Sequence, residues 1–554
     1  MNGSRRWWTL LLPVVLACGD REPAGEAAIA PQRGGTVVVV NNTDLDNMNT
    51  LLTQNRYTQE VSRYLLFLPL VHYGPELEYV PSLAERWELL GDTGVVFHLR
   101  HDVRWHDGVQ TTARDVVFTY ERARDPETAF PNAEYFVHWT GVTAPDSFTV
   151  RFSFVPHLDP MAGLPFLPIM PAHLLDSIPS SRLQQAAFNK RPVGNGPFRF
   201  VEQRTNDRWI FEANPDHPEA LGGRPYIDRL VYRPVPEASV QVTEVSTGGA
   251  DLALNPPSTQ FAQLSQQPGL RGVARSGRQY ASVIWNGRVE PFDNAAVRRA
   301  LTYAIDRRQI LETLRAGHGD LAAGPIGPYH WAYDDALQPL PFNVDSARAL
   351  LAQAGIRDID GDSILELPNG RDFTIEVKIP AGSEITRNMA EMIRANLSAI
   401  GVRITTRQTD FATLIEDITS PRRNFQATIV AWESDFRINL RDIFHSSAIG
   451  TPNQTASYGN PRVDSLIDRA GTARTREEAK PVYAELQRIL RDEQPWTFLY
   501  YYPDLVLMRD RLQGADMDVR GAFVNVQKWW VTDPQPARSD SADRGPARDS
   551  APAR

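Results

Sequence analysis

The sequence predicts a mixed α/β fold in which helices cover a sheet that contains parallel strands. Residues 373–379 alternate between apolar and polar side chains, which is typical of a half-buried strand. Residues 385–400 then place apolar side chains on one helical face, Gly401 can end that helix, and residues 402–408 follow as another strand. A strand, a helix and a strand in this order predict a right-handed parallel unit.

Elements of both kinds are also predicted in the first half of the chain. Residues 36–40 are β-branched and residues 95–99 are largely apolar, so both runs are strand candidates. Residues 111–124 are predicted to form a helix, because Thr112 and Asp115 have the spacing of a capping pair at its start.

A second mixed region begins near residue 284. Asp293 or Asn294 can cap the helix that follows. Residues 425–432 are apolar enough for a central strand, and polar residues 433–435 come directly after it. Because ligands bind beyond the carboxyl ends of strands in open parallel sheets, the end of this strand is the predicted place for a site.

Length and charge limit the classes of function. At 554 residues with 42% hydrophobic and 23% charged side chains, the chain predicts several packed units of a globular protein. The 58 basic and 67 acidic side chains give a net charge of −9. This balance argues against a surface whose main task is to bind nucleic acid.

The N-terminal residues predict export. Two arginines precede the apolar residues 7–16, a run too short to span a bilayer comfortably. Ala17 and Cys18 follow, and this ending resembles the bacterial lipoprotein signal, which implies a signal peptide over residues 1–17 and a lipid on Cys18. The alternative for Cys18, the only cysteine of the sequence, is a buried core thiol.

Polar segments flank the predicted body of the protein. Residues 18–33 contain proline, glycine and alanine and are predicted to form a lipidated tether. Residues 533–554 lack apolar anchors, so we expect a disordered tail. With prolines interrupting the other apolar runs, the expected location is an extracytoplasmic or periplasmic face, with the membrane reached through the lipid anchor only.

Several segments occur in the order found in one receptor family. They are RGGTVVV (33–39), the stretch 79–123 with its P-S-L-A, F-x-L-R, H-D-G and D-V-V-F landmarks, VGNGPFRF (193–200), EANPDH (212–217), GGADLAL (248–254), PFDNAAVRRALTYAIDRRQI (291–310) and SARALLAQAG (346–355). The similarity runs from about residue 33 to residue 530, which is nearly the whole mature chain. The chain thus resembles the extracellular solute-binding proteins of ABC importers, in the family that binds oligopeptides, dipeptides and nickel chelates.

The resemblance implies the type II periplasmic-binding-protein architecture, with two lobes, hinge crossover strands and an extra domain inserted in the first lobe. We expect the first lobe in three pieces, the inserted domain between the first two, and a continuous second lobe. These are residues 34–72, 194–283 and 497–532 for the first lobe, 73–193 for the inserted domain and 284–496 for the second lobe. Residues 279–286 and 496–507 are the expected hinge crossings, because both are rich in aromatic and β-branched side chains.

The resemblance also implies a ligand site. In peptide-binding relatives a Trp-x-x-Asp segment places the aspartate against the α-ammonium of the peptide, and Trp432 and Asp435 match it. The structural alternative is that Asp435 caps a helix near Leu440. Trp285 and Asn286, at the expected hinge, are further candidates for ligand contacts, with hinge packing as their alternative.

The residues after Asp435 depart from the family pattern. Many relatives have an aromatic residue and then a second Asp-Pro, whereas this chain has Phe436, Arg437, Ile438 and Asn439. The departure leaves the identity of the ligand open. Residues 329–333 are an aromatic cluster that can either pack or stack on a ligand, and packing is favoured.

The expected function is a lipid-anchored receptor that captures peptides by lobe closure and delivers them to an ABC importer. Its expected partners are a peptide or other small solute and the permease subunits; we expect a monomer, no cofactor and no nucleic acid. The alternatives are a nickel chelate or an oligosaccharide as cargo, or a sensory binding protein without an importer. An enzyme is disfavoured, since the sequence has no H-E-x-x-H, no G-x-S-x-G and no catalytic cysteine.

Two groups of residues suggest metal binding but favour another explanation. His101, Asp102, His106 and Asp107 could supply ligands, yet the family carries a similar turn irrespective of metal. Asp358, Asp360 and Asp362, with Glu366 as a possible fourth ligand, resemble the start of a calcium loop. Its glycine falls at the fourth place and not the sixth, so a polar loop is favoured and no metal site is predicted.

Overall fold

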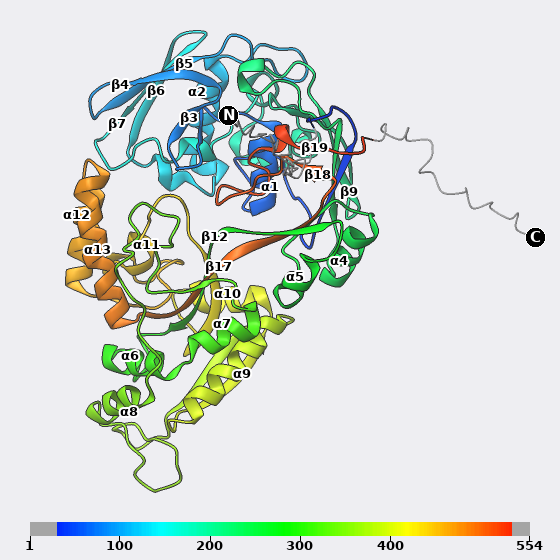
Figure 1. Ribbon diagram of the computed structural model, residues 1–554. Coiled ribbons are helices and arrows are strands. Elements are labelled where there is room, and N and C mark those ends of the chain that lie inside the picture. Colours follow the sequence, from blue (N-terminus) through cyan, green and yellow to red (C-terminus); the bar gives the residue numbers. More distant parts are fainter. Residues whose placement is uncertain (1–29, 535–554) are drawn as a thin grey trace, which may run out of the picture.

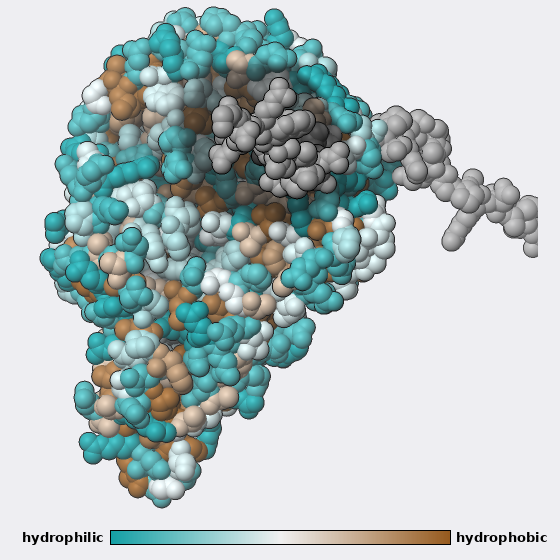
Figure 2. Space-filling model, in the orientation of Figure 1, coloured by the Kyte–Doolittle hydropathy of each residue, from teal (hydrophilic) through white to brown (hydrophobic). Residues whose placement is uncertain are grey.

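The computed structural model describes residues 30–534. Figure 1 shows a broad upper part and a narrower lower part, with the long strands β12 (Leu270–Trp285) and β17 (Trp496–Arg509) running between them. We call the upper part the first lobe and the lower part the second lobe. Polar residues cover most of the face in Figure 2, and apolar residues form scattered groups on it.

An 11-stranded sheet extends through both lobes. Its strand order is β15-β14-β16-β12-β17-β11-β1-β10-β9-β8, with β13 paired to β17 at the side. The bounds of its other strands are β1 (Thr36–Asn41), β8 (Phe198–Arg204), β9 (Arg208–Ala213), β10 (Arg229–Pro234), β11 (Leu252–Leu254), β13 (Asp320–Leu321), β14 (Thr374–Pro380), β15 (Arg403–Thr409) and β16 (Ala427–Glu433).

The first lobe also holds a four-stranded antiparallel sheet of order β4-β5-β7-β6. These strands are β4 (Ala84–Leu89), β5 (Gly94–Leu99), β6 (Trp139–Asp146) and β7 (Thr149–Phe154), and β2 (Val71–Tyr73) pairs with β3 (Tyr79–Pro81) beside them. The predicted helix is α2 (Ala113–Arg124), and the capping box of Thr112 and Asp115 is confirmed. One hydrophobic core joins this sheet to β1, so the boundaries of the inserted domain, 73–193, stay a prediction.

The second lobe confirms the predicted parallel unit. Strand β14 pairs with β15 in parallel, and α9 (Glu384–Ser398) connects them. Helix α6 (Ala295–Ala304) begins after Asn294, whose side chain accepts a hydrogen bond from the backbone of Ala296. Side chains of β12 alternate between two cores, since Val283 packs in one and Ile284 in the other. Helices therefore cover both faces of the sheet here.

The remaining α-helices and strands connect or cover these sheets. They are α1 (Arg56–Val61), α3 (Ala172–Leu175), α4 (Ala238–Thr247), α5 (Ser258–Leu264), α7 (Arg307–Arg315), α8 (Val344–Gln353), α10 (Phe411–Thr419), α11 (Arg441–Phe444), α12 (Pro461–Thr472), α13 (Arg476–Glu493), β18 (Leu512–Gln513) and β19 (Trp530–Val531). Over residues 30–534, no helix combines the length and the apolar character needed to cross a membrane.

The two long strands change register where they pass between the lobes. Strand β12 pairs with β17 from Leu270 to Arg275 and again from Gln279 onward, with an irregularity between. Gly277 lies in this irregularity, and a Cβ there would come 2.2 Å from the backbone oxygen of Tyr502. Only glycine allows the backbones to approach so closely, which accounts for the residue at this crossing.

Candidate functional site

Two neighbouring cavities lie next to the end of strand β16. The inner cavity has a volume of about 150 Å³ and is lined mainly by the second lobe. The cleft cavity has a volume of about 390 Å³, and its walls come from the first lobe and from the second lobe. Residues 437–440 contribute to both, so the segment that follows the predicted site separates the two spaces.

The lining of each cavity combines aromatic and charged side chains. The inner cavity is lined, among others, by Tyr280, Tyr329, His330, Trp432, Glu433 and Asp435. The cleft cavity is lined, among others, by Glu134, Tyr135, Asp159, Trp331, Arg437 and Asp442. Aromatic walls with a few polar groups are typical of ligand sites.

The structure places Trp432 and Asp435 together at the inner cavity. Trp432 is the penultimate residue of β16, and its ring packs against Trp496 with centroids 5.4 Å apart. Asp435 follows the strand, accepts a hydrogen bond of 2.7 Å from the backbone of Phe436, and keeps 36% of its side chain exposed. It does not cap α11, whose N-cap residue Leu440 has no side-chain cap. The carboxylate is thus held at a strand end and remains open to a ligand.

Tyrosines surround the Asp435 segment. Tyr329 donates a hydrogen bond of 3.0 Å to the backbone oxygen of Asp435. Burial raises the pKa of Tyr135 well above its usual value, and the charge of Asp435 raises it further. Tyr135 therefore stays protonated, and its buried hydroxyl, which has no hydrogen-bond partner among the described residues, is available as a donor from the first lobe. His330 packs beneath, with Nε2 2.8 Å from the backbone oxygen of Phe436, and burial lowers its pKa to about 4.

Arg437 reaches from the second lobe to the first. Its Nη1 donates a hydrogen bond of 3.1 Å to the backbone oxygen of Glu134, and its guanidinium lies 4.9 Å from the ring centre of Tyr135. The pKa of Glu134 is raised above its ordinary value, mainly by burial and also by the charges of Asp435 and Asp442, although Arg437 opposes the shift. The cleft cavity thus offers carboxylates to a cation and a guanidinium to an anion.

Trp285 and Asn286 lie away from this site. The Nε1 of Trp285 donates a hydrogen bond of 2.9 Å to Thr497, and Asn286 donates to two backbone oxygens of the second lobe. Strand β12 pairs Tyr280 with Trp432 but Trp285 with Ala427. At the rise of an antiparallel strand this separation is about 17 Å. The structure does not bring the four predicted residues together, and a ligand contact of Trp285 or Asn286 stays a prediction.

Sequence reasoning missed the first-lobe side of the cavity. Glu134, Tyr135 and Asp159 are distant from Asp435 in the chain and carry no motif, so no signal pointed to them. Arg437 did carry a signal, since it lies where the sequence departs from the family pattern. Tyr280 was inside a predicted hinge strand, and its side chain lines the inner cavity.

The two groups of residues that suggested metal binding differ in whether the structure brings their side chains together or engages them with the backbone. Both ring nitrogens of His106 are used by backbone groups, with Nε2 3.1 Å from the oxygen of Gly196 and Nδ1 accepting from the amide of Gly194. Burial lowers the pKa of His106 to about 4, so this neutral ring is structural.

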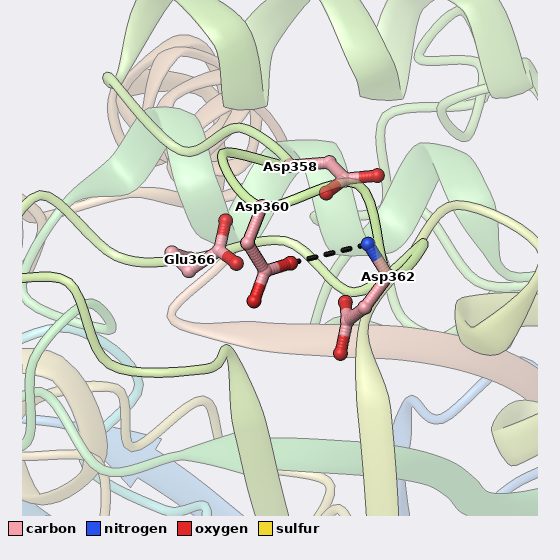
Figure 3. Close-up of side chains that lie close together, drawn as sticks. All are labelled: Asp358, Asp360, Asp362 and Glu366. Carbon is pink, nitrogen blue, oxygen red and sulfur yellow. Dashed lines mark hydrogen bonds between the residues drawn. The ribbon is translucent and has the colours of Figure 1, made fainter.

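The acidic loop does bring its four carboxylates together. Figure 3 shows the side chains of Asp358, Asp360, Asp362 and Glu366 gathered around one loop. One carboxylate oxygen of each lies within 4.8 Å of the others. Several of these oxygens already accept backbone amides: Asp360 from Asp362 at 3.1 Å, and Glu366 from Ile359 at 2.7 Å. Such bonds shape a polar loop by themselves. Cys18, the predicted lipid site, lies outside the described residues.

The known proteins whose sequences are similar to this chain are extracellular solute-binding proteins. The model of the family described as bacterial extracellular solute-binding proteins, family 5 Middle, matches residues 78–439. The oligopeptide-binding protein AppA of Bacillus subtilis is 29% identical over 520 residues, which cover 92% of this chain and 94% of AppA. The heme-binding protein A of Haemophilus influenzae is 30% identical over 467 residues, which cover 78% of this chain and 81% of that protein.

The fold agrees with the sequence matches. The solved structure of AppA from Bacillus subtilis in complex with a nonapeptide superimposes with a TM-score of 0.78 at 28% identity, and the match covers 91% of this chain and 100% of that chain. The two-lobe α/β fold with hinge crossover strands is confirmed by this likeness. The chain belongs to family 5 of the bacterial extracellular solute-binding proteins, which serve ABC transporters.

Proposed function

We propose that this protein is a non-enzymatic receptor that captures peptides by closing its lobes and delivers them to an ABC importer in the cytoplasmic membrane. The observation that carries the proposal is the carboxylate of Asp435, held beyond the end of β16 at a cavity beside the interface of the lobes. A relative named as an oligopeptide-binding protein, 29% identical over most of the chain, supports the same cargo.

The chemistry of the site favours a ligand with a free amino group. An ammonium loses its water when the lobes close, which is costly unless a carboxylate pairs with it. Asp435 supplies that carboxylate, and the hydroxyls of Tyr135 and Tyr329 lie close to the same segment. Closure around the peptide makes affinity depend on surfaces of both lobes at once.

Thermal-shift measurements on the purified protein test this proposal. The probes are peptides of two to nine alanines, the same peptides with acetylated amino groups, and the Asp435→Asn variant. We expect free-amine peptides to raise the midpoint of unfolding by mass action, and we expect acetylation or the variant to abolish the shift. Asp176→Asn, an exposed aspartate paired with Arg114, is the matched control and should respond like the unmodified protein. Peptides that leave every midpoint unchanged would refute a peptide cargo.

A metal chelate is the second candidate cargo, because two imidazoles lie at the cleft cavity. The rings of His138 and His157 have centroids 4.6 Å apart, and both residues line this cavity. Imidazole is a suitable ligand for nickel and iron. Heme and nickel–histidine therefore belong in the same screen: a shift with either that is retained in Asp435→Asn and lost in His157→Ala would favour this cargo over peptides.

We further propose that Cys18 carries the lipid that tethers the receptor to the membrane. The support is the sequence around Cys18 alone, a cysteine directly after an apolar run. Expression in a bacterium that makes lipoproteins should yield a protein that partitions into detergent, whereas Cys18→Ser should remain in the aqueous phase. Equal partitioning of both forms would contradict the anchor.

A further inference from the structure

A network of charged side chains connects the first lobe to the segment that carries Asp435. Arg56 of α1 forms a short ion pair with Asp504 of β17 and a second pair of 3.2 Å with Glu60. Helix α1 belongs to the first lobe, since Tyr57 and Val61 pack in its core. Arg56 is therefore fixed in the first lobe by two carboxylates.

Glu433 is the point at which this network enters the second lobe. It is the last residue of β16, and its Oε1 lies 2.5 Å from Nη2 of Arg278 and 3.6 Å from Nε of Arg56. One carboxylate oxygen is thus shared between a guanidinium of the first lobe and a guanidinium of the crossing strand β12. The side chain of Glu433 is 31% exposed, so the pairs are only partly screened by water.

Arg278 in turn holds the segment that binds the ligand. Its Nη1 donates to the backbone oxygen of Ser434 at 3.3 Å and lies 3.9 Å from Oδ1 of Asp435, and its guanidinium lies 4.8 Å from the ring centre of Phe436. Although burial disfavours its charge, Glu433 raises the pKa of Arg278 above the ordinary value. Arg278 is thus a permanent cation beside the carboxylate of Asp435.

We propose that Glu433 is a positioning residue that couples lobe closure to the ligand site, because it pairs with Arg56 across the lobes and also forms the shorter of the two ion pairs of Arg278, whose other carboxylate is Asp435. This inference rests on the proposed function, in which Asp435 binds an ammonium. When the lobes open, Arg56 keeps Asp504 and Glu60, and Glu433 keeps Arg278. Opening breaks the Arg56–Glu433 pair and also the pairs of Arg476 with Asp159 and of Arg474 with Asp92, which join the lobes as well. Arg56 and Glu433 each keep a charged partner, which suits a reversible motion.

The same geometry explains why Glu433 matters to the ligand. Without its charge, Arg278 has Asp435 as its nearest remaining carboxylate, 3.9 Å away. A guanidinium that pairs with Asp435 competes with the ammonium of the ligand for the same oxygens. Loss of Glu433 should therefore weaken closure and reduce the preference for a free amino group.

The first test needs no ligand. We would measure the radius of gyration of the full chain, kept unlipidated by Cys18→Ser, by small-angle X-ray scattering. Glu433→Gln should enlarge the radius of the unliganded protein, because one of the ion pairs between the lobes is lost while the Arg476–Asp159 and Arg474–Asp92 pairs remain. The matched control is Glu485→Gln, which removes a pair with Arg462 inside the second lobe and should leave the radius unchanged. An unchanged radius in Glu433→Gln would overturn the proposal even if no peptide binds.

The second test measures tetra-alanine and its acetylated form by calorimetry. We expect Glu433→Gln to weaken binding of the free-amine form about fivefold to tenfold. The ratio of the affinities for the free-amine and the acetylated peptide should therefore become smaller. In a double-mutant cycle the effect of Arg56→Gln should be smaller in the Glu433→Gln background. If the unmodified protein binds tetra-alanine and Glu433→Gln binds it equally well, the coupling is refuted while the peptide function stands.

Discussion

Asp504 is the carboxylate on which the packing between α1 and the crossing strands depends. Its side chain is 6% exposed and lies 2.8 Å from Nη2 of Arg275, besides its pair with Arg56. Burial opposes its charge, yet Arg275 and Arg56 hold the pKa of Asp504 below its ordinary value. Removing this carboxylate leaves the buried Arg275 with Glu60, 4.0 Å away, as its remaining carboxylate partner among the described residues, and the buried charges are then poorly compensated.

Asp504→Asn should therefore lower the free energy of unfolding by about 3–5 kcal/mol. Urea denaturation at neutral pH measures the loss. The matched control is Asp468→Asn, because Asp468 lies on α12 and forms an exposed pair with Arg441. This variant should lower the free energy of unfolding by about 0–1 kcal/mol. A cost for Asp504→Asn as small as that of the control would show that the buried network contributes little.

The lowered pKa of Asp504 also predicts a pH dependence with a definite sign. The folded-state pKa lies below the ordinary value of 3.8, so the stabilisation is complete above about pH 4 and is lost as the pH falls through the folded value. In Asp504→Asn the free energy of unfolding should fall less steeply below pH 4 than in the unmodified protein. If the free energy of unfolding falls equally steeply with pH in both proteins, Asp504 is not the group responsible for this pH dependence.

At the scale of elements, the crossing of β12 and β17 depends on Gly277. A methyl group there would meet the backbone oxygen of Tyr502 at 2.2 Å, so the strands would have to separate. Gly277→Ala should lower the free energy of unfolding by about 1–3 kcal/mol, as overpacking does elsewhere. Gly471→Ala in α12 is the control, because its Cβ meets nothing within 4 Å and alanine should stabilise the helix by about 1 kcal/mol. Denaturant unfolding of both variants measures these changes in the free energy of unfolding.

Elements with strong local signals could be predicted from the sequence to within about two residues. The unit of β14, α9 and β15 shows a clear change from a period of two to a helical period. Strand β12 was predicted only from residue 279, yet it begins at Leu270. Its first part contains Arg271, Gly272 and Arg275, which break the alternation, and pairing with β17 stabilises it in spite of that pattern.

At the scale of the whole molecule, Phe436 joins the second lobe to the first. It comes from the second lobe, but its ring packs in the core of the first lobe, 5.3 Å from Tyr73 and 5.7 Å from Phe166 between centroids. Closure therefore buries an apolar side chain as well as joining the ion pairs. Burial of a phenylalanine contributes about 1.5–3 kcal/mol.

Phe436→Ala should favour the open form and weaken peptide affinity about tenfold or more. Calorimetry with tetra-alanine measures the affinity, and scattering measures the radius of the unliganded protein. Phe411→Ala is the control and should change neither quantity, because Phe411 is 64% exposed. An affinity for Phe436→Ala equal to that of the control would mean that Phe436 does not contribute to closure.

The sequence by itself determined the α/β class, the strand–helix–strand unit of the second lobe, the family and the position of Trp432 and Asp435 at the end of a strand, because local periodicity, caps and ordered motifs occur along the chain. Only the tertiary structure decided which distant residues face that pair. Glu134, Tyr135, Arg278 and the bridge through Glu433 meet Asp435 through lobe packing and strand register. Such contacts depend on how separate elements pack against one another, and no local pattern in the chain records that packing.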